Sequence, residues 1–228
     1  MTGRAWVTFD CYGTLIDWEG GVADALSPFL DPAPDRRTLA ARYIEIEAEV
    51  EHETYRPYRD VLAEASGRLM RALERPLPPG RERALPESLP RWRPFPEVTA
   101  ALRRLRDAGY RIGILSNVDR DLIETSVPQL GLEPDLIVTA EDCRSYKPAP
   151  GHWRTFEARA GADARTTVHV AASVFHDVVP ASALGYRTVF VNRHGEDVRG
   201  AAPTRVLPDL SRLPETIGEL HGARTPSP

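Results

Sequence analysis

The first segment that could carry out chemistry is VTFDCYGT. In it, Asp10 follows a short apolar run, and Gly13 comes three residues after Asp10. An aspartate at the end of a strand, before a glycine-containing loop, is placed to act as a nucleophile with backbone N–H groups nearby. Taken alone, the pattern is equally typical of an aspartate that caps a turn. Other segments have to decide between these two interpretations.

Three further segments supply polar groups that could join Asp10. ILSNVD carries Ser116 and Asn117, YKPAP carries Lys147, and Asp177 follows TVHVAAS. Lys147 is the only lysine, because the other 28 of the chain's 29 Lys and Arg residues are arginine. Each feature also has a plain structural explanation: Ser116 could cap a strand end, Asp177 could cap a helix, and a lone lysine could be an accident of composition.

The elements that must position these residues follow from the hydrophobic pattern. Apolar runs that end in polar residues indicate strands, and they cover residues 5–9, 110–117, 135–142, 167–173 and 186–193. Helical patterns lie between them, as at 96–109 and 149–161, each ending at a glycine. Strands that alternate with helices predict an α/β fold, a Rossmann-like doubly wound parallel sheet. Ligands of such sheets bind beyond the carboxyl ends of the strands, where Asp10 and Ser116 fall.

One long segment interrupts this alternation. Residues 39–53 and 58–74 have amphipathic helical patterns with no strand between them, and residues 75–96 hold seven of the 21 prolines. Such a proline density suits neither a helix interior nor a central strand. We therefore predict a helical cap domain inserted into the core. The predicted boundaries are a core domain at 1–16 and 93–220, a helical cap domain at 17–92 and a flexible tail at 221–228.

Composition and charge narrow the classes of partner. The formal net charge of −4 argues against nucleic acid or an anionic membrane as the main partner. It says little about a small substrate, because the charge inside a pocket can oppose the global sign. The two cysteines form no disulfide framework and the N-terminus lacks a signal-peptide pattern, so a cytoplasmic location is expected. No run approaches the ~18 apolar residues of a membrane span.

Together and in this order, the motifs resemble those of the haloacid dehalogenase superfamily. They are the strand ending in D-C-Y-G-T, the S-N pair, the K-P pair and the terminal D-x-x-x-A-x-x-x-G, and they cover nearly the whole chain. RWRPFPEV also resembles that family's re-entry from a helical cap. The resemblance is closest to the type II 2-haloacid dehalogenases because residue 12 is Tyr12. Phosphatases of the superfamily have a second aspartate there, which protonates the leaving alcohol.

The resemblance implies a hydrolase that works through a covalent aspartyl ester and needs no cofactor. Asp10 would be the nucleophile and Thr14 would hydrogen-bond to it. Lys147 would pair with the carboxylates, and Asp177 would orient Lys147 or the hydrolytic water. A compact ammonium can serve two carboxylates and a substrate oxygen together, where a planar guanidinium would be too large, and its charge keeps Asp10 ionised. Ser116 and Asn117 would hold the anionic group of a small substrate. A homodimer is an open option.

Several positions depart from the type II pattern. Ala172 and Val174 stand where those enzymes have a serine and an asparagine linked to the hydrolytic water, and neither side chain can hydrogen-bond. This favours a non-catalytic family member over a dehalogenase. Trp153 replaces a tyrosine six residues after the lysine, and with Tyr12 it is expected to line the substrate pocket. Arg42 is the best positional match for the cap arginine that binds carboxylate or halide.

Three functions remain open at this point. The first is a metal-independent hydrolase that acts on a 2-halo acid or a similar electrophilic carbon, which Tyr12 favours. The second is a Mg²⁺-dependent small-molecule phosphatase, with the ion held weakly by Asp10, the backbone carbonyl of Tyr12 and Asp177. The third is a repurposed, non-catalytic protein that keeps the fold and binds a metabolite or partner. The intact polar set disfavours the third, because the stability of the fold does not require that cluster of charges. We rank the three in this order.

Overall fold

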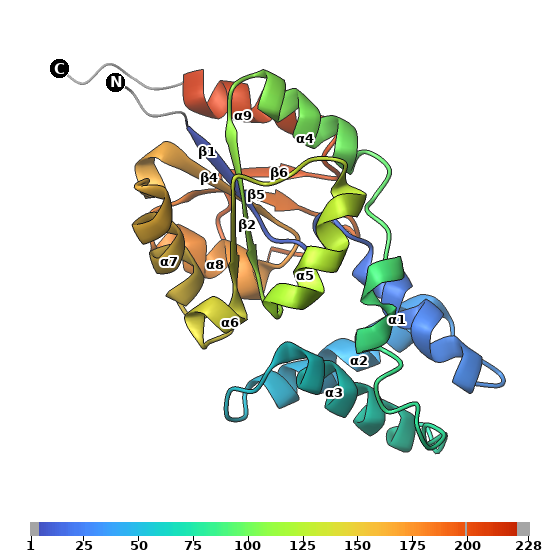
Figure 1. Cartoon of the computed structure of the whole chain (residues 1–228). Coiled ribbons are helices and arrows are strands. Elements are labelled where there is room, and N and C mark those ends of the chain that lie inside the picture. The colour runs from blue at the N-terminus through green and yellow to red at the C-terminus, as the bar shows by residue number, and fades with distance from the viewer. Residues whose placement is uncertain (1–4, 199, 223–228) are drawn as a thin grey trace.

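A six-stranded parallel sheet forms the centre of the molecule (Figure 1). The computed structural model describes residues 5–198 and 200–222. The strands lie in the order β3-β2-β1-β4-β5-β6, with every neighbouring pair parallel. Their bounds are β1 Trp6–Phe9, β2 Arg111–Ser116, β3 Leu136–Thr139, β4 Thr167–Ala171, β5 Arg187–Val191 and β6 Arg205–Leu207. The predicted doubly wound α/β fold is confirmed.

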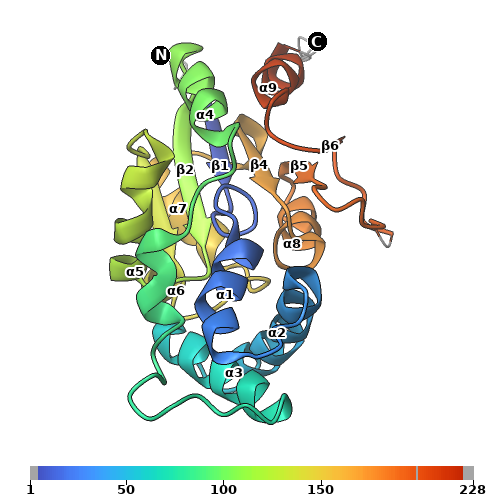
Figure 2. The same cartoon turned by 90° about the vertical axis from the view of Figure 1, so that its right-hand side faces the viewer.

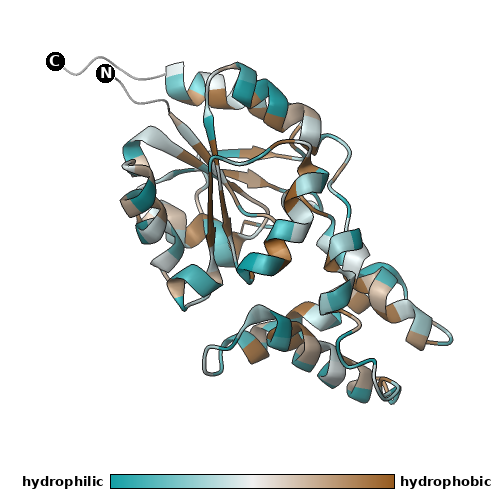
Figure 3. Cartoon of the chain, viewed as in Figure 1, coloured by the Kyte–Doolittle hydropathy of each residue, from teal (hydrophilic) through white to brown (hydrophobic). Residues whose placement is uncertain are grey.

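Helices cover both faces of the sheet, as the continuous apolar strands require. One face packs against α4 (Val98–Asp107), α5 (Arg120–Ser126) and α9 (Leu213–Gly222). The other packs against α7 (Gly151–Ala160) and α8 (Val179–Ala183). The short helix α6 (Ala140–Cys143) follows β3. Figure 3 shows the consequence, since the inner strands are largely hydrophobic and the helices carry hydrophilic residues.

The predicted strands are found with shorter ends, but one strand was missed. β6 has only three residues, and both Arg205 and Val206 are exposed, so it lacks the apolar run that reveals a buried strand. The helix α9 continues to Gly222, so residues 221 and 222 are helical and do not belong to a tail. The remainder of the predicted tail, 223–228, lies outside the described residues. Among the described helices, none has the length and apolar character needed to cross a bilayer.

The cap segment lies beyond the carboxyl edge of the sheet (Figure 2). Its helices are α1 (Trp18–Leu26), α2 (Arg36–Glu51) and α3 (Tyr58–Ala72), followed by a 3-10 helix at Pro86–Arg91 in the proline-rich stretch. The side chains of Asp17 and Asp35 cap α1 and α2 by accepting backbone N–H groups of their first turns. Residues 17–92 thus hold helices and no strand of the sheet, as expected of the predicted helical cap.

The two passages of the chain between core and cap run side by side. Asp17 donates its N–H to the carbonyl of Arg93 at 2.9 Å, and Phe95 donates to the carbonyl of Leu15 at 3.0 Å. Trp92 then packs on Gly21, where a Cβ atom would lie 2.4 Å from the indole ring. Glycine is therefore required at residue 21 for this close approach.

Candidate active site

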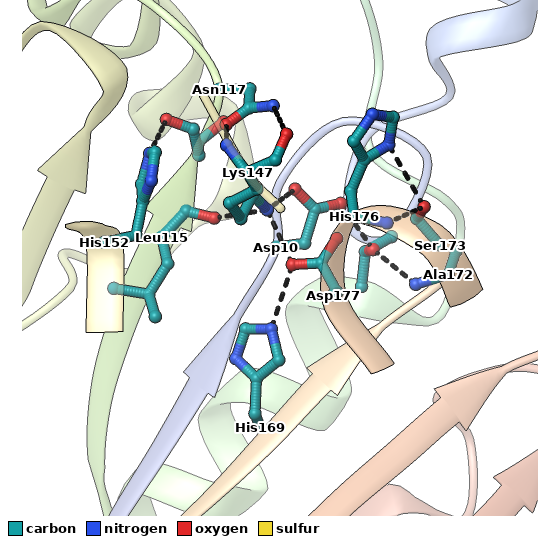
Figure 4. Close-up of polar contacts among 12 residues, drawn as sticks. Asp10, Leu115, Asn117, Lys147, His152, His169, Ala172, Ser173, His176 and Asp177 are labelled. Carbon is teal, nitrogen blue, oxygen red and sulfur yellow. Dashed lines mark hydrogen bonds and ion pairs between the residues drawn. The ribbon is translucent and has the colours of Figure 1, made fainter. Parts of the chain in front are cut away.

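The centre of the site is a buried ion triad. Lys147 Nζ lies 2.9 Å from Asp10 Oδ1 and 2.7 Å from Asp177 Oδ1 (Figure 4). Its third contact, at 3.0 Å, is the carbonyl oxygen of Leu115. Lys147 is 2% exposed, so protein atoms rather than water satisfy the ammonium. All three donors of the ammonium are used by the protein, so the expected contact between Lys147 and a substrate oxygen has no donor left.

The strand order brings the triad together. Asp10 follows β1 and Asp177 follows β4, and these neighbouring strands flank the point where the strand order reverses. Such a switch point is where open α/β sheets bind their ligands. Lys147 comes from the loop between α6 and α7 and reaches this edge from the side of β2. The carboxyl edge of the sheet therefore carries the site.

The charges of the triad act on one another. Burial alone would lower the pKa of Lys147, but Asp10 and Asp177 raise it above its usual value. Burial would raise the pKa of Asp177, but Lys147 and His169 hold it well below the usual range. For Asp10, burial is the largest influence and the net direction of its pKa is upward. Asp177 is thus the more firmly ionised carboxylate of the pair.

The loop after β1 holds Asp10 by a chain of hydrogen bonds. Thr14 Oγ1 donates to Asp10 Oδ2 at 2.8 Å and accepts the N–H of Ala172 at 2.9 Å. The chain turns at Gly13, whose φ of 89° is in the left-handed region that glycine tolerates. Thr14 therefore ties the loop after β1 to the end of β4, and the structure brings it to Asp10 as expected.

Ser116 and Asn117 lie beside the triad but have different surroundings. Ser116 Oγ is buried and has no hydrogen-bond partner among the described residues, so its hydroxyl is available to a substrate. Asn117 uses both ends of its side-chain amide on the backbone of Lys147, accepting its N–H at 2.7 Å and donating to its carbonyl at 3.1 Å. Asn117 therefore positions Lys147 through both groups of its amide.

His169 belongs to the site although sequence reasoning missed it. Its Nε2 lies 3.0 Å from Asp177 Oδ1 and its Nδ1 lies 3.0 Å from Thr8 Oγ1. An ionised carboxylate can only accept hydrogen bonds, so Nε2 carries the proton. The one available signal was a histidine inside an otherwise apolar, fully buried strand, since β4 reads TVHVA.

Comparison with known proteins gives the family. A model of the haloacid dehalogenase-like hydrolases matches residues 5–185. The chain belongs to this family. The hydrolase is 29% identical over 230 residues to haloacetate dehalogenase H-2 of Moraxella sp. (strain B), covering 92% of this chain and 96% of the relative. It is also 28% identical over 224 residues to a probable phosphatase, IndB, of Dickeya dadantii (strain 3937), covering 94% and 93% of the two chains.

Solved structures agree with the fold of the hydrolase. The crystal structure of an L-2-haloacid dehalogenase matches with a TM-score of 0.83 at 25% identity, covering 95% of this chain and 100% of the other. The L-2-haloacid dehalogenase of Xanthobacter autotrophicus matches with a TM-score of 0.84 at 22% identity, covering 94% and 98%. At this identity, the second likeness concerns the fold alone.

The structure does not bring Trp153 of the hydrolase to the triad. Trp153 is fully buried on α7 and packs with Trp6 and Phe156 in the core on one face of the sheet. Its ring lies 5.5 Å from that of His169, so it supports the site from behind rather than lining a pocket. The helical period of α7 turns Trp153 and Phe156 toward the sheet.

Arg42 is also absent from the site. It is exposed on α2, whose buried residues include Leu39, Tyr43 and Val50. These follow the spacing of one helix face, and Arg42 lies outside that face. Arg42 therefore does not supply the cap arginine that was expected at the triad.

Tyr12 is anchored away from the triad carboxylates. Its hydroxyl lies 2.9 Å from Ser126 Oγ on α5, and its ring packs edge-on against Trp92 at 5.7 Å. Burial raises the pKa of the Tyr12 phenol well above its usual value. The phenol thus stays neutral and is held between the core and the end of the cap segment.

Hydrogen bonds also fix the cap over the site. The buried carboxylate of Asp119, after β2, accepts the N–H groups of Tyr58 at 2.8 Å and of Arg59 at 2.9 Å. These are the free donors at the start of α3, where Pro57 offers no side-chain cap. Tyr146 donates to the carbonyl of Arg56 at 2.7 Å. A core aspartate thus caps a helix of the cap segment.

Lys147 already binds two of the groups that would hold a magnesium ion. The phosphatase alternative needs Asp10, the carbonyl of Tyr12 and Asp177 as ligands. Asp177 Oδ1 already accepts from Lys147 and His169, and Lys147 also holds Asp10 Oδ1, so the ion would have to bind through the other carboxylate oxygens, of which Asp10 Oδ2 accepts from Thr14. Within the described part of the chain, no group of three or more His, Cys, Asp or Glu side chains could hold a metal.

Proposed function

We propose that the hydrolase is a 2-haloacid dehalogenase that acts on a small anionic 2-halo acid without a metal ion. The observation that carries this proposal is the triad, in which Lys147 binds Asp10 and Asp177 at 2.9 and 2.7 Å. An ammonium in this place leaves Asp10 as an anionic oxygen nucleophile beside a fixed positive charge. The similarity to haloacetate dehalogenase H-2 over most of both chains supports the same function.

The proposed reaction has two steps. An Asp10 carboxylate oxygen attacks the carbon that bears the halogen, a C–O bond forms, and the C–halogen bond breaks with release of halide. Water then adds to the carboxyl carbon of the resulting ester, and the 2-hydroxy acid leaves. Ser116 Oγ, the buried hydroxyl without a partner among the described residues, would donate to the substrate carboxylate.

The position of Tyr12 supports halide over alcohol as the leaving group. A halide leaves as an anion and needs no proton, whereas an alcohol released from a phosphate ester is helped by a general acid. Tyr12 directs its hydroxyl to Ser126, so it does not supply such an acid. The buried triad also supports a catalytic protein over a non-catalytic one, because burying three charges has a desolvation cost.

A substrate screen tests the proposal. The purified protein is incubated with chloroacetate, with each enantiomer of 2-chloropropionate and with p-nitrophenyl phosphate, each with EDTA or with Mg²⁺. We expect halide release under both conditions and its loss in Asp10→Asn, with an unchanged circular dichroism spectrum. Mass spectrometry checks that the variant is not hydrolysed back to aspartate. Phosphate release that needs Mg²⁺, with no halide release, would instead identify a phosphatase.

A further inference from the structure

A π-helix follows β4 and carries the neighbouring polar residues His176 and Asp177. It spans Val174–Val178 and begins at Ser173, whose Oγ accepts the N–H of His176 at 3.1 Å. His176 Nδ1 lies 3.2 Å from the same oxygen. π-helices are rare and are frequent at functional sites. This one folds the His176 imidazole back onto Ser173 at the carboxyl edge of the sheet.

A carboxylate of the cap meets the same imidazole. Glu51, the last residue of α2, has Oε2 3.7 Å from His176 Nε2, and its side chain is 9% exposed. Burial and the neighbouring Glu47 raise the pKa of the Glu51 carboxyl well above its usual value, which favours its neutral form, and a separation of 3.7 Å is longer than a hydrogen bond. Ser173, His176 and Glu51 therefore form a chain of side chains that crosses from the π-helix of the core to the end of α2 in the cap.

This chain begins close to the nucleophile. Ala172 donates its N–H to Thr14 Oγ1, which donates to Asp10 Oδ2, and Ser173 is the next residue. Figure 4 shows Ser173 and His176 on one side of Asp10, with Asn117 and His152 on the other. Asp10 and Lys147 are near enough to influence the pKa of His176, which burial lowers overall. The imidazole is thus neutral at neutral pH.

The other groups at this edge are poorly suited to activating water. Asp177 Oδ1 accepts hydrogen bonds from both Lys147 and His169, which makes the carboxylate a weak base. Ala172 and Val174 have no hydrogen-bonding side chain. We propose that Ser173, His176 and Glu51 form a proton relay that activates the water which hydrolyses the ester on Asp10. This inference rests on the proposed function, since it requires that ester.

The relay moves one proton in each direction. The water oxygen forms a bond to the carboxyl carbon of the Asp10 ester while a water proton passes to Ser173 Oγ and the hydroxyl proton of Ser173 passes to His176 Nδ1. The Glu51 carboxyl oxygen that faces Nε2 favours the tautomer with the proton on Nε2, which leaves Nδ1 free to take that proton. The tetrahedral intermediate then breaks its bond to the substrate oxygen, which receives the proton back through Ser173. The 2-hydroxy acid leaves, and the Asp10 carboxylic acid loses its proton beside Lys147. Ser173 contacts the reacting water, and Glu51 is a positioning residue.

The test separates the two chemical steps. Rapid-quench measurements of His176→Gln and Ser173→Ala with 2-chloropropionate follow the burst of halide, the steady-state rate and the Asp10 adduct by mass spectrometry. We expect an unchanged burst, a steady-state rate lower by ~10²-fold, as for loss of a general base, and accumulation of the ester. Glu51→Gln should give a smaller accumulation. Added imidazole should restore part of the turnover of His176→Ala.

The matched control is His52→Gln. His52 lies beside the relay, with its ring 6.5 Å from Phe175, but it is not part of the chain from Ser173 to Glu51, so both phases should be unchanged. Equal loss of burst and steady-state rate in the His176 and Ser173 variants, with no ester, would show a structural role and overturn the relay. A parent protein that never forms an ester on Asp10 would overturn the proposed function and the relay together. A parent that forms the ester, with variants that hydrolyse it normally, would overturn the relay alone.

Discussion

The side-chain amide of Asn117 binds both backbone groups of Lys147, accepting the N–H at 2.7 Å and donating to the carbonyl at 3.1 Å. The ammonium of Lys147 meets Asp10 and Asp177 at the far end of its side chain. The position of the positive charge therefore depends on a residue that does not touch either carboxylate.

The first prediction concerns this support. Asn117→Ala removes both hydrogen bonds, and we expect kcat to fall by about 10²-fold because a misplacement near 1 Å at a reacting centre has that effect. Asn192→Ala is a matched control. Asn192 makes the same pair of bonds to the backbone of Glu196, at 2.7 and 2.8 Å, outside the site. If both variants retain the parent's kcat, Lys147 is positioned by other contacts.

The second prediction concerns the type of cation. Lys147→Arg keeps the charge, but the guanidinium is larger than an ammonium that makes three contacts between 2.7 and 3.0 Å. We expect it to lower kcat/KM nearly as much as Lys147→Ala, by at least ~10²-fold. Arg103→Lys, an exposed change on α4, should leave kcat/KM unchanged. Substantial activity in Lys147→Arg would mean that charge alone is needed and that the single lysine is an accident of composition.

The third prediction concerns metal. Lys147 lies between Asp10 and Asp177, so halide release should be unaffected by EDTA and by later addition of Mg²⁺. The measurement is the initial rate of halide release from chloroacetate after dialysis against the chelator. A rate that disappears with EDTA and returns with Mg²⁺ would show that a cation binds at these carboxylates.

The fourth prediction concerns the dependence of stability on pH. Glu47, on α2, accepts hydrogen bonds from the hydroxyls of Tyr58 at 2.7 Å and Tyr43 at 3.2 Å. Burial nevertheless raises its pKa from 4.5 to about 7. The folded protein therefore holds this proton more tightly than the unfolded chain does, and its contribution to the free energy of unfolding falls as pH rises from 4.5 to about 7.

Glu47→Gln should remove that pH-dependent loss. We expect the variant to gain on the order of 1 kcal/mol relative to the parent between pH 5 and pH 8, as measured by urea denaturation at both values. Glu49→Gln, an exposed change on the same helix, is the control. The free energy of unfolding of this variant should depend on pH as that of the parent does. A constant difference between Glu47→Gln and the parent across this range would show that Glu47 does not titrate on unfolding.

The triad could be predicted from the sequence because parallel strands bring their carboxyl ends to one edge. Asp10 and Asp177 each follow an apolar run, and the strand order makes these runs neighbours. Lys147 was identified by its uniqueness rather than by a strand. Its contact with both carboxylates depends on a loop whose course no local pattern describes.

The contacts that pattern reasoning missed are made between elements far apart in the chain. Asn117 and Lys147 are separated by 30 positions, and only the folded loop brings the amide of one to the backbone of the other. His169 is hidden in an apolar strand, and Glu51 is one acid among several on an amphipathic helix. Hydrophobic period shows which residues are buried, but it does not show which polar side chains meet.

The paired passages of the chain at Leu15–Asp17 and Arg93–Phe95 have a consequence for how such enzymes diversify. Because the chain leaves the core and returns to it at adjacent points, the whole segment between them is joined to the sheet as a side branch. Inserts whose two ends lie close together are well tolerated by a host fold. One such segment can therefore be exchanged for another without changing the strand order. A single recombination event could then join the existing core, with Asp10 at its sheet edge, to a different cap segment.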